Sequence, residues 1–330
     1  MENFNVIEFH RARDFSRKLN ATFEFIKQNF KGLGKSILMI AGPPVLVASL
    51  IIGSFIGEFT SFTQQAALNG GRVEGMENYF LSISFWLQII LMIVFLTLSS
   101  IMNIATINNY LVLYGEKRTN KIEVSEVWAR VRSTFWMYFR TMLLFMVLII
   151  AAYIVLLIPI GILGVISPFL VFFGFVFFFC GLIYLIFGAS LTFIIRAFEN
   201  NGFFVAIGRS FKLVKDKWWS TFGLITVLYL IMGITSYIFI MPWYIITMMS
   251  ALHSTSIDTF QGPSEGWQLM TILIFTLYYL AQMILAALPN IGIAFQYFNL
   301  VELKEAKGLM TQIETLGQPQ TPPPAQDEHY

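Results

Sequence analysis

Stretches without charged residues alternate with short basic segments along this chain. Asp, Glu, Lys and Arg are absent from five ranges: 36–57, 78–115, 141–195, 218–257 and 266–301. A helix that crosses the hydrocarbon core of a bilayer needs about 20 apolar residues. The range 141–195 is long enough for two such helices, and each of the other ranges holds one. The pattern therefore predicts an all-α, polytopic transmembrane bundle of six helices.

Local signals divide the chain into three regions. Pro43 and Pro44 suit the first turn of a helix and would break it deeper inside, so the first span starts or bends there. We expect an N-terminal amphipathic helix in 1–35, the transmembrane domain at 36–308, and a proline-rich, disordered tail at 309–330. The expected spans are 36–57, 79–99, 142–158, 168–187, 219–241 and 267–288.

An amphipathic pattern recurs three times. Its apolar positions step by 4, 3 and 4 residues, which is one face of an α-helix, with a basic residue beside them. Each copy directly precedes an odd-numbered span, which predicts a pseudo-threefold repeat of one amphipathic helix and one transmembrane hairpin. The aromatic and basic members are Phe23, Lys27 and Phe30 in the first copy, Trp128, Arg132 and Phe135 in the second, and Phe211, Lys215 and Trp218 in the third.

The apolar stripe of these helices has two possible environments. It can lie in the acyl boundary of the membrane while Lys and Arg meet anionic headgroups. Alternatively, it packs on the ends of the even-numbered helices, whose apolar sequence continues past the expected span. In both cases the nine residues form a membrane-interface or partner-binding surface.

The basic residues indicate how the chain is oriented. The formal net charge is only +2, too small to favour a nucleic-acid partner. Of the 21 Lys and Arg residues, only Arg72 lies in a segment on the opposite side from the others. Basic segments stay in the cytoplasm under the positive-inside rule. We therefore expect both termini on the cytoplasmic side of the membrane.

The sequence offers little material for catalysis. The chain is 57% hydrophobic and 12% charged, and the expected spans contain no ionisable Asp, Glu, Lys, Arg or His, which are the groups that membrane enzymes and ion-coupled transporters use. His10, His253 and His329 have no metal-ligand spacing, and Cys180 is the sole cysteine. We therefore expect no enzyme activity, no metal and no cofactor.

One polar region stands out inside the predicted bundle. Gln282 and Asn290 flank Pro289, and a proline-broken helix with nearby amides is one way to form a transport cavity. Such amides also commonly cross-link helices by hydrogen bonds. Gln282, Pro289 and Asn290 are thus the candidate transport path.

The third basic helix carries a family resemblance. Residues 206–215 (AIGRSFKLVK), Trp218-Trp219 and 221–224 (TFGL) resemble poorly characterised bacterial six-helix inner-membrane proteins. They are also similar to the membrane domain attached to some glycerophosphodiester phosphodiesterases. The resemblance implies a membrane module, and because the soluble phosphodiesterase domain is missing, no catalytic residue carries over.

Two functions are open at this point. The leading hypothesis is a non-enzymatic membrane module, either a subunit or scaffold of an envelope complex or a lipid-associated protein. Its partners would be membrane lipids with anionic headgroups, or another membrane protein. The alternative is a transporter or channel for an apolar or zwitterionic small molecule.

Overall fold

The computed structural model describes residues 5–68, 75–253, 265–306 and 310. These residues are almost entirely helical and contain no strand. Except for Met310, the expected tail at 309–330 lies outside them. The helices are α1 (Phe15–Ile40), α2 (Gly42–Leu68), α3 (Met76–Leu81), α4 (Ile83–Lys117), α5 (Val124–Ile166), α6 (Pro168–Gly188), α7 (Thr192–Glu199), α8 (Phe203–Val214), the 3₁₀ helix η1 (Lys215–Lys217), α9 (Trp218–His253), α10 (Glu265–Leu285) and α11 (Ala287–Glu305).

Six helical segments of the described chain are long and apolar enough to cross a membrane, which confirms the all-α, six-span architecture and a multi-pass membrane protein. Five are longer than a bilayer requires: two are single long helices, α4 and α5, and the other three combine adjoining helices. They are Gly42–Thr60, Ile83–Lys117, Val124–Ile166, Pro168–Glu199, Phe203–Met249 and Gly266–Glu305.

The first span begins at Gly42, which is later than the expected bound at residue 36 and agrees with the start or bend expected at Pro43 and Pro44. The division at residue 35 falls inside α1, which continues to Ile40 and is capped by Ala41, whose N–H donates to the Ile37 carbonyl at 2.9 Å. Pro43 and Pro44 have no N–H to continue the α1 hydrogen-bond pattern, and they lie in the first turn of α2. The first helix therefore ends at the prolines, and a new helix starts there.

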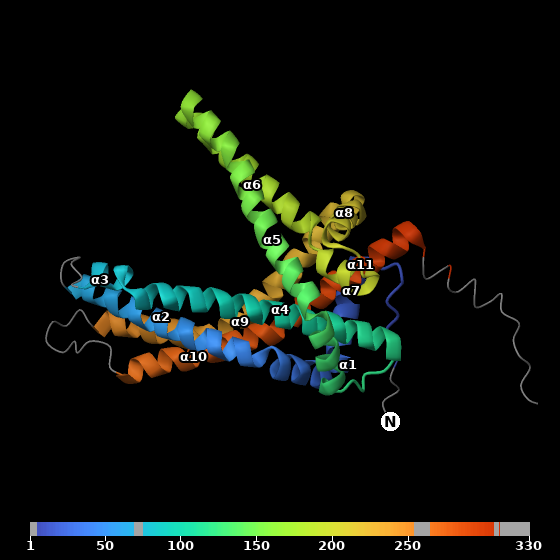
Figure 1. The fold of residues 1–330 in the computed structure, drawn as a ribbon, viewed down its shortest axis with the longest axis horizontal. Helices are drawn as coiled ribbons and strands as arrows, with labels where there is room; N and C mark the ends of the chain where they lie inside the picture. Colours follow the sequence, from blue (N-terminus) through green and yellow to red (C-terminus); the bar gives the residue numbers. More distant parts are fainter. Residues whose placement is uncertain (1–4, 69–74, 254–264, 307–309, 311–330) are drawn as a thin grey trace, which may run out of the picture.

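The helices form two arms that diverge from a common junction (Figure 1). We call α2, α4, α9 and α10, which lie side by side, the four-helix arm. The α5–α6 hairpin projects away from it and is the hairpin arm. The junction contains α1, α7, α8 and α11 together with the C-terminal half of α4 and the start of α5.

The main hydrophobic core lies in the junction. Ile101 to Tyr114 of α4 is almost entirely buried, and so is most of Ala287 to Val301 of α11. By contrast, many large apolar side chains of the hairpin arm are exposed, such as Val147 and Phe169. Exposed apolar arms suit a hydrocarbon solvent, in which apolar side chains need no burial.

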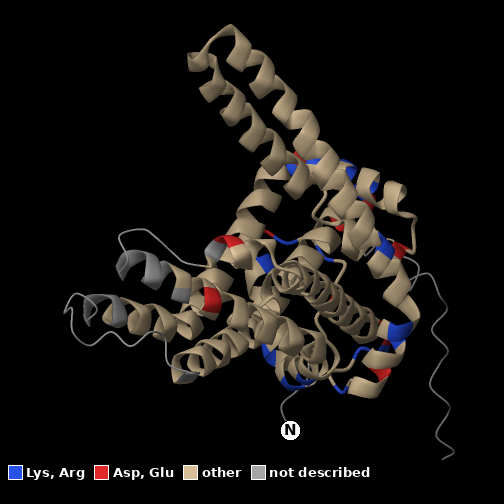
Figure 2. Cartoon of the chain, turned by 60° about the vertical axis from the view of Figure 1, so that its left-hand side comes forward, with Lys and Arg blue, Asp and Glu red and all other residues tan. Residues whose placement is uncertain are grey.

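Charge is concentrated at the same place. Every Lys and Arg that the structure describes belongs to 11–35, 117–140, 196–217 or Lys304. Figure 2 shows these residues around the junction, whereas the outer part of the hairpin arm carries no charge. The described basic residues thus lie at one end of the molecule, which we call the charged end, whereas the charged residues described in the four-helix arm outside the junction are acidic, such as Glu58.

Candidate functional site

The three repeated helices pack into the junction, and the same position of the repeat is buried in each. Thr22, Val127 and Ser210 occupy the same place in the three copies, and each is fully buried. Each directly precedes an aromatic residue of the stripe, and the first two of these aromatics, Phe23 and Trp128, are both 45% exposed. The face that packs inside is therefore rotated by about one residue from the expected stripe.

Some residues of the apolar stripe are consequently buried in the protein, and others are exposed on its surface. Val131 and Val214 are fully buried, whereas Phe30 is 63% exposed. The remaining aromatics, Phe135, Phe211 and Trp218, are partly buried, and the basic residues Lys27, Arg132 and Lys215 are exposed. The repeated helices therefore pack on the ends of α4 and α11, as one of the two alternatives predicted. The face that packs is the one next to the expected stripe, so aromatic and basic side chains of the stripe point outward.

In the third copy, a glycine allows a close approach. Ser210 Oγ donates to the Gly188 carbonyl at 2.6 Å and accepts from the Leu191 N–H at 3.2 Å. A Cβ atom at Gly188 would lie 2.2 Å from the Phe211 ring. Phe211 therefore packs directly on the end of α6, which fixes α8 at the base of the hairpin arm.

A buried lysine lies on the inward face of α1. Lys18 is 2% exposed, and its ammonium donates to Gln296 Oε1 at 2.7 Å and to Ser220 Oγ at 2.9 Å. Gln296 Nε2 in turn donates to Thr221 Oγ1 at 2.8 Å. Burial lowers the pKa of Lys18 from its ordinary value of 10.5 to about 8; Asp14 opposes this shift and Lys217 adds to it.

Sequence reasoning missed Lys18, although a signal was present. Lys18, Thr22, Phe25 and Asn29 also step by 4, 3 and 4 residues, and all four are buried. Because these four residues are partly polar, the pattern does not identify them as a buried face, and the adjacent, more hydrophobic stripe of α1 is chosen in their place. In a membrane protein, polar residues often face the helix interface while apolar ones face lipid.

The segment before α1 is anchored in the junction. The ring of Phe9 stacks on Phe298 with a centroid distance of 4.6 Å. The Arg13 N–H donates to Asn299 Oδ1 at 2.7 Å, and the guanidinium lies 5.3 Å from the centroid of the Phe295 ring. The N-terminal segment is therefore tied to α11.

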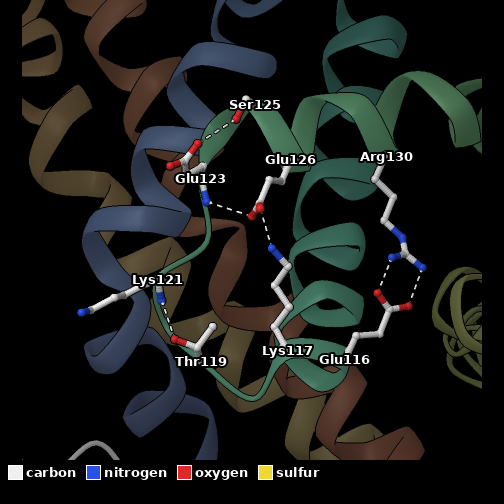
Figure 3. A network of polar contacts seen from close by, with 8 residues as sticks. All are labelled: Glu116, Lys117, Thr119, Lys121, Glu123, Ser125, Glu126 and Arg130. Atoms are coloured by element: carbon white, nitrogen blue, oxygen red, sulfur yellow. Dashed lines mark hydrogen bonds and ion pairs between the residues drawn. The ribbon is translucent and has the colours of Figure 1, made fainter.

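Two ion-pair networks join the charged helices. Figure 3 shows the α4–α5 connection, where Arg130 forms two hydrogen bonds with Glu116, at 2.6 and 2.8 Å, and Lys117 pairs with Glu126. The second network centres on Glu199 of α7, which is more enclosed and pairs with Arg209 of α8. The first network is largely exposed and shapes the turn that precedes α5.

A large apolar cavity lies at the fork between the two arms. It has a volume of about 760 Å³ and is lined by residues of α4, α5, α6, α7, α8, α9 and α11. None of its lining residues is Asp, Glu, Lys, Arg or His, and the few polar ones include Asn108, Ser190 and Asn290. We call it the fork cavity. Its volume lies within the range of cavities that hold small ligands, about 300–1,000 Å³.

The candidate transport residues lie around the break between α10 and α11. Pro289 is buried, and Asn290 lines the fork cavity while its Nδ2 donates to the Ala286 carbonyl at 2.7 Å. Gln282 donates to the Tyr278 hydroxyl at 2.9 Å and lines a separate cavity of about 210 Å³. The structure therefore places the two amides at different cavities.

In the described part of the chain, no group of three His, Cys, Asp or Glu side chains is arranged to hold a metal ion. In comparisons with protein-family models, curated proteins and solved structures, nothing matches this chain. The resemblance to glycerophosphodiester phosphodiesterase membrane domains therefore stays a prediction.

Proposed function

We propose that this protein is a non-enzymatic, lipid-associated membrane module that holds the hydrocarbon chain of a membrane lipid in the fork cavity. The observation that carries the proposal is the cavity itself, which is apolar, uncharged and located where the two arms separate. We place the charged end in the cytoplasm on the basis of the positive-inside rule, and the module in a bacterial inner membrane on the basis of the resemblance carried by residues 206–224.

The chemistry of the lining supports a lipid chain as the occupant. Transfer of a chain from the bilayer into an apolar cavity gains no hydrophobic free energy, because both environments are apolar. Selectivity must then come from shape and from the few polar groups. Nδ2 of Asn290 is engaged with Ala286, which leaves its Oδ1 as an acceptor for a hydroxyl or amide of the lipid.

The test places a large side chain in the fork cavity, from a residue that lines it. Ala152 of α5 lines the fork cavity, whereas Val147 of the same helix does not line it and is 64% exposed. We expect Ala152→Trp to lose a lipid that the wild-type protein and the control Val147→Trp retain through purification in mild detergent. Native mass spectrometry with identification of the bound lipid measures this.

Two results would refute the proposal. One is a wild-type protein that carries no tightly bound lipid. The other is an Ala152→Trp variant that keeps the lipid while it unfolds at the wild-type temperature. A variant that loses the lipid and also fails to fold is replaced by Ala152→Leu, which fills less of the same space.

Transport of an apolar or zwitterionic small molecule is a second candidate. The favouring observation is that the break between α10 and α11 places Asn290 at the wall of the fork cavity. Uptake that is lost in both Asn290→Leu and Gln282→Leu would support it. Uptake that is unaffected by either change would exclude this path.

A further inference from the structure

A second cavity, distinct from the fork cavity, combines an apolar wall with a basic end. It is a groove of about 730 Å³ between α6 and the η1–α9 corner. Cys180, Ile183 and Tyr184 of α6 form part of its apolar wall, and Lys215 and Lys217 of η1 line it at the corner with α9. We call this cavity the basic groove.

The two lysines of the basic groove carry exposed charge. Both side chains are exposed, and within the described chain neither makes an ion pair. The one carboxylate at the groove, that of Asp216, is paired with Lys304 at 2.8 Å. The basic end of the groove therefore has an excess of positive charge.

A third cation, the ammonium of Lys18, lies close to the basic groove but is buried. Ser220 lines the basic groove, and its Oγ accepts the hydrogen bond from the buried ammonium of Lys18 at 2.9 Å. The hydrogen-bond acceptors of Lys18, Ser220 and Gln296, are neutral. An anion at the mouth of the groove would thus be attracted by Lys18 as well, through a weakly screening interior.

Aromatic side chains mark the depth at which this groove meets a membrane. Trp218 and Trp219 line it, and their rings are in edge-to-face contact with a centroid distance of 4.9 Å. Trp219 is 78% exposed. Tryptophan is enriched where hydrocarbon meets headgroups. The groove is thus lined by lysines, tryptophans and apolar residues of α6, which match the headgroup and acyl chain of one lipid.

From this arrangement we infer that the basic groove is a binding site for an anionic phospholipid, with its phosphate at Lys215 and Lys217 and one acyl chain along Ile183 and Cys180. The inference rests on the proposed lipid-associated function and adds a lipid class and a second site to it. A soluble phosphate would contact only the lysines, and the apolar wall would then bind nothing.

The experiment measures lipid preference with a quenching probe. Purified full-length protein is placed in nanodiscs of phosphatidylcholine that contain increasing fractions of phosphatidylglycerol with brominated acyl chains, and quenching of tryptophan fluorescence is recorded. Brominated phosphatidylcholine is the zwitterionic reference. We expect the wild type to prefer phosphatidylglycerol, and Trp219→Phe to reduce the quenching amplitude.

Charge variants then test the assignment. We expect Lys215→Gln combined with Lys217→Gln to weaken the preference by about 30-fold at low salt, given the typical attraction of two basic side chains to an anionic lipid. Lys31→Gln with Lys121→Gln removes the same charge from exposed positions outside the groove and should leave the preference intact. The charge-conserving pair Lys215→Arg and Lys217→Arg should preserve it.

Three outcomes would overturn the inference. They are an unchanged preference in the Lys215→Gln, Lys217→Gln variant, an equal loss in the Lys31→Gln, Lys121→Gln control, and full displacement of the lipid by millimolar inorganic phosphate. Failure of the fork-cavity proposal is recognised separately, because Ala152→Trp changes the other cavity. That variant should keep the preference for phosphatidylglycerol.

Discussion

The ammonium of Lys18 donates a 2.7 Å hydrogen bond to Oε1 of Gln296, which lies 278 residues further along the chain. This contact joins the first helix to α11 inside the junction. A buried cation whose hydrogen-bond acceptors are neutral has a substantial desolvation cost, and hydrogen bonds to the charged form offset only part of it. The pair therefore connects α1 to α11 at the cost of some stability at neutral pH.

The lowered pKa of Lys18 predicts that stability rises with pH. Between about pH 8 and 10.5 the unfolded chain holds a proton on Lys18 that the folded chain has released, so the free energy of unfolding increases with pH. From pH 7.5 to 9.5 the expected gain from this residue is about 2 kcal/mol. Below about pH 8 the contribution levels off, because Lys18 is charged in both states.

Denaturant unfolding in detergent at the two pH values measures the effect as a difference between variants. Lys18→Met should lack this pH-dependent gain, and Lys31→Met, at an exposed position of the same helix, should keep it. An equal pH dependence in the wild type and in Lys18→Met would show that Lys18 does not titrate in this range.

The spans were predictable because their signal is strong and local. Charge-free ranges of sufficient length allow one interpretation, and Pro43 and Pro44 marked the start of the first span. Only the outer bound at residue 36 was too early, because α1 is amphipathic and then continues into apolar residues without a break before Ala41.

The inward face of the repeated helices was not predictable by the same reasoning. An amphipathic pattern identifies the buried face only when the surroundings are water. Here Phe23 and Phe30 face outward while Lys18 and Asn29 are buried. The fork cavity was also hidden from the sequence, since its wall combines seven helices that meet only in the folded chain.

Close packing within the four-helix arm depends on Gly53. A Cβ atom at this position would lie 2.7 Å from the Cα atom of Ile272 on α10, so the two backbones would have to separate. We expect Gly53→Ala to destabilise the protein by about 1–3 kcal/mol. Thermal unfolding in detergent measures this.

The matched control is Gly233→Ala in α9, where the added Cβ would meet no atom within 4 Å beyond the adjacent residues and backbone of its own helix. This change should be neutral or should stabilise by up to about 1 kcal/mol, because alanine favours a helix over glycine. Equal effects of the two substitutions would contradict the close approach of α2 and α10.

The ion pair between Glu199 and Arg209 should matter more than the pair between Glu116 and Arg130. The Glu199 side chain is 13% exposed and also accepts from the Tyr297 hydroxyl at 2.8 Å, whereas Glu116 is 53% exposed. We expect Glu199→Ala to cost about 2–4 kcal/mol, because it leaves a partly buried guanidinium without this partner.

Glu116→Ala should cost under about 1 kcal/mol, as is typical of exposed pairs. Unfolding midpoints of both variants, compared in the same detergent, provide the measurement. A larger loss for Glu116→Ala would mean that the α4–α5 turn, and not the contact of α7 with α8 and α11, limits the stability of the junction.

The proposed orientation predicts which end of the molecule is accessible from outside the cell. Cys180 is the sole cysteine, so a Cys180→Ser background permits single reporters at exposed positions: Asn78→Cys at the far end of the four-helix arm and Lys121→Cys at the charged end. Moving basic residues across the bilayer is unfavourable during insertion. We therefore expect an impermeant maleimide to label Asn78→Cys in intact cells and Lys121→Cys only after permeabilisation. The reverse pattern would place the basic groove on the outer side, where it would meet a different lipid leaflet, and the positive-inside argument would fail for this chain.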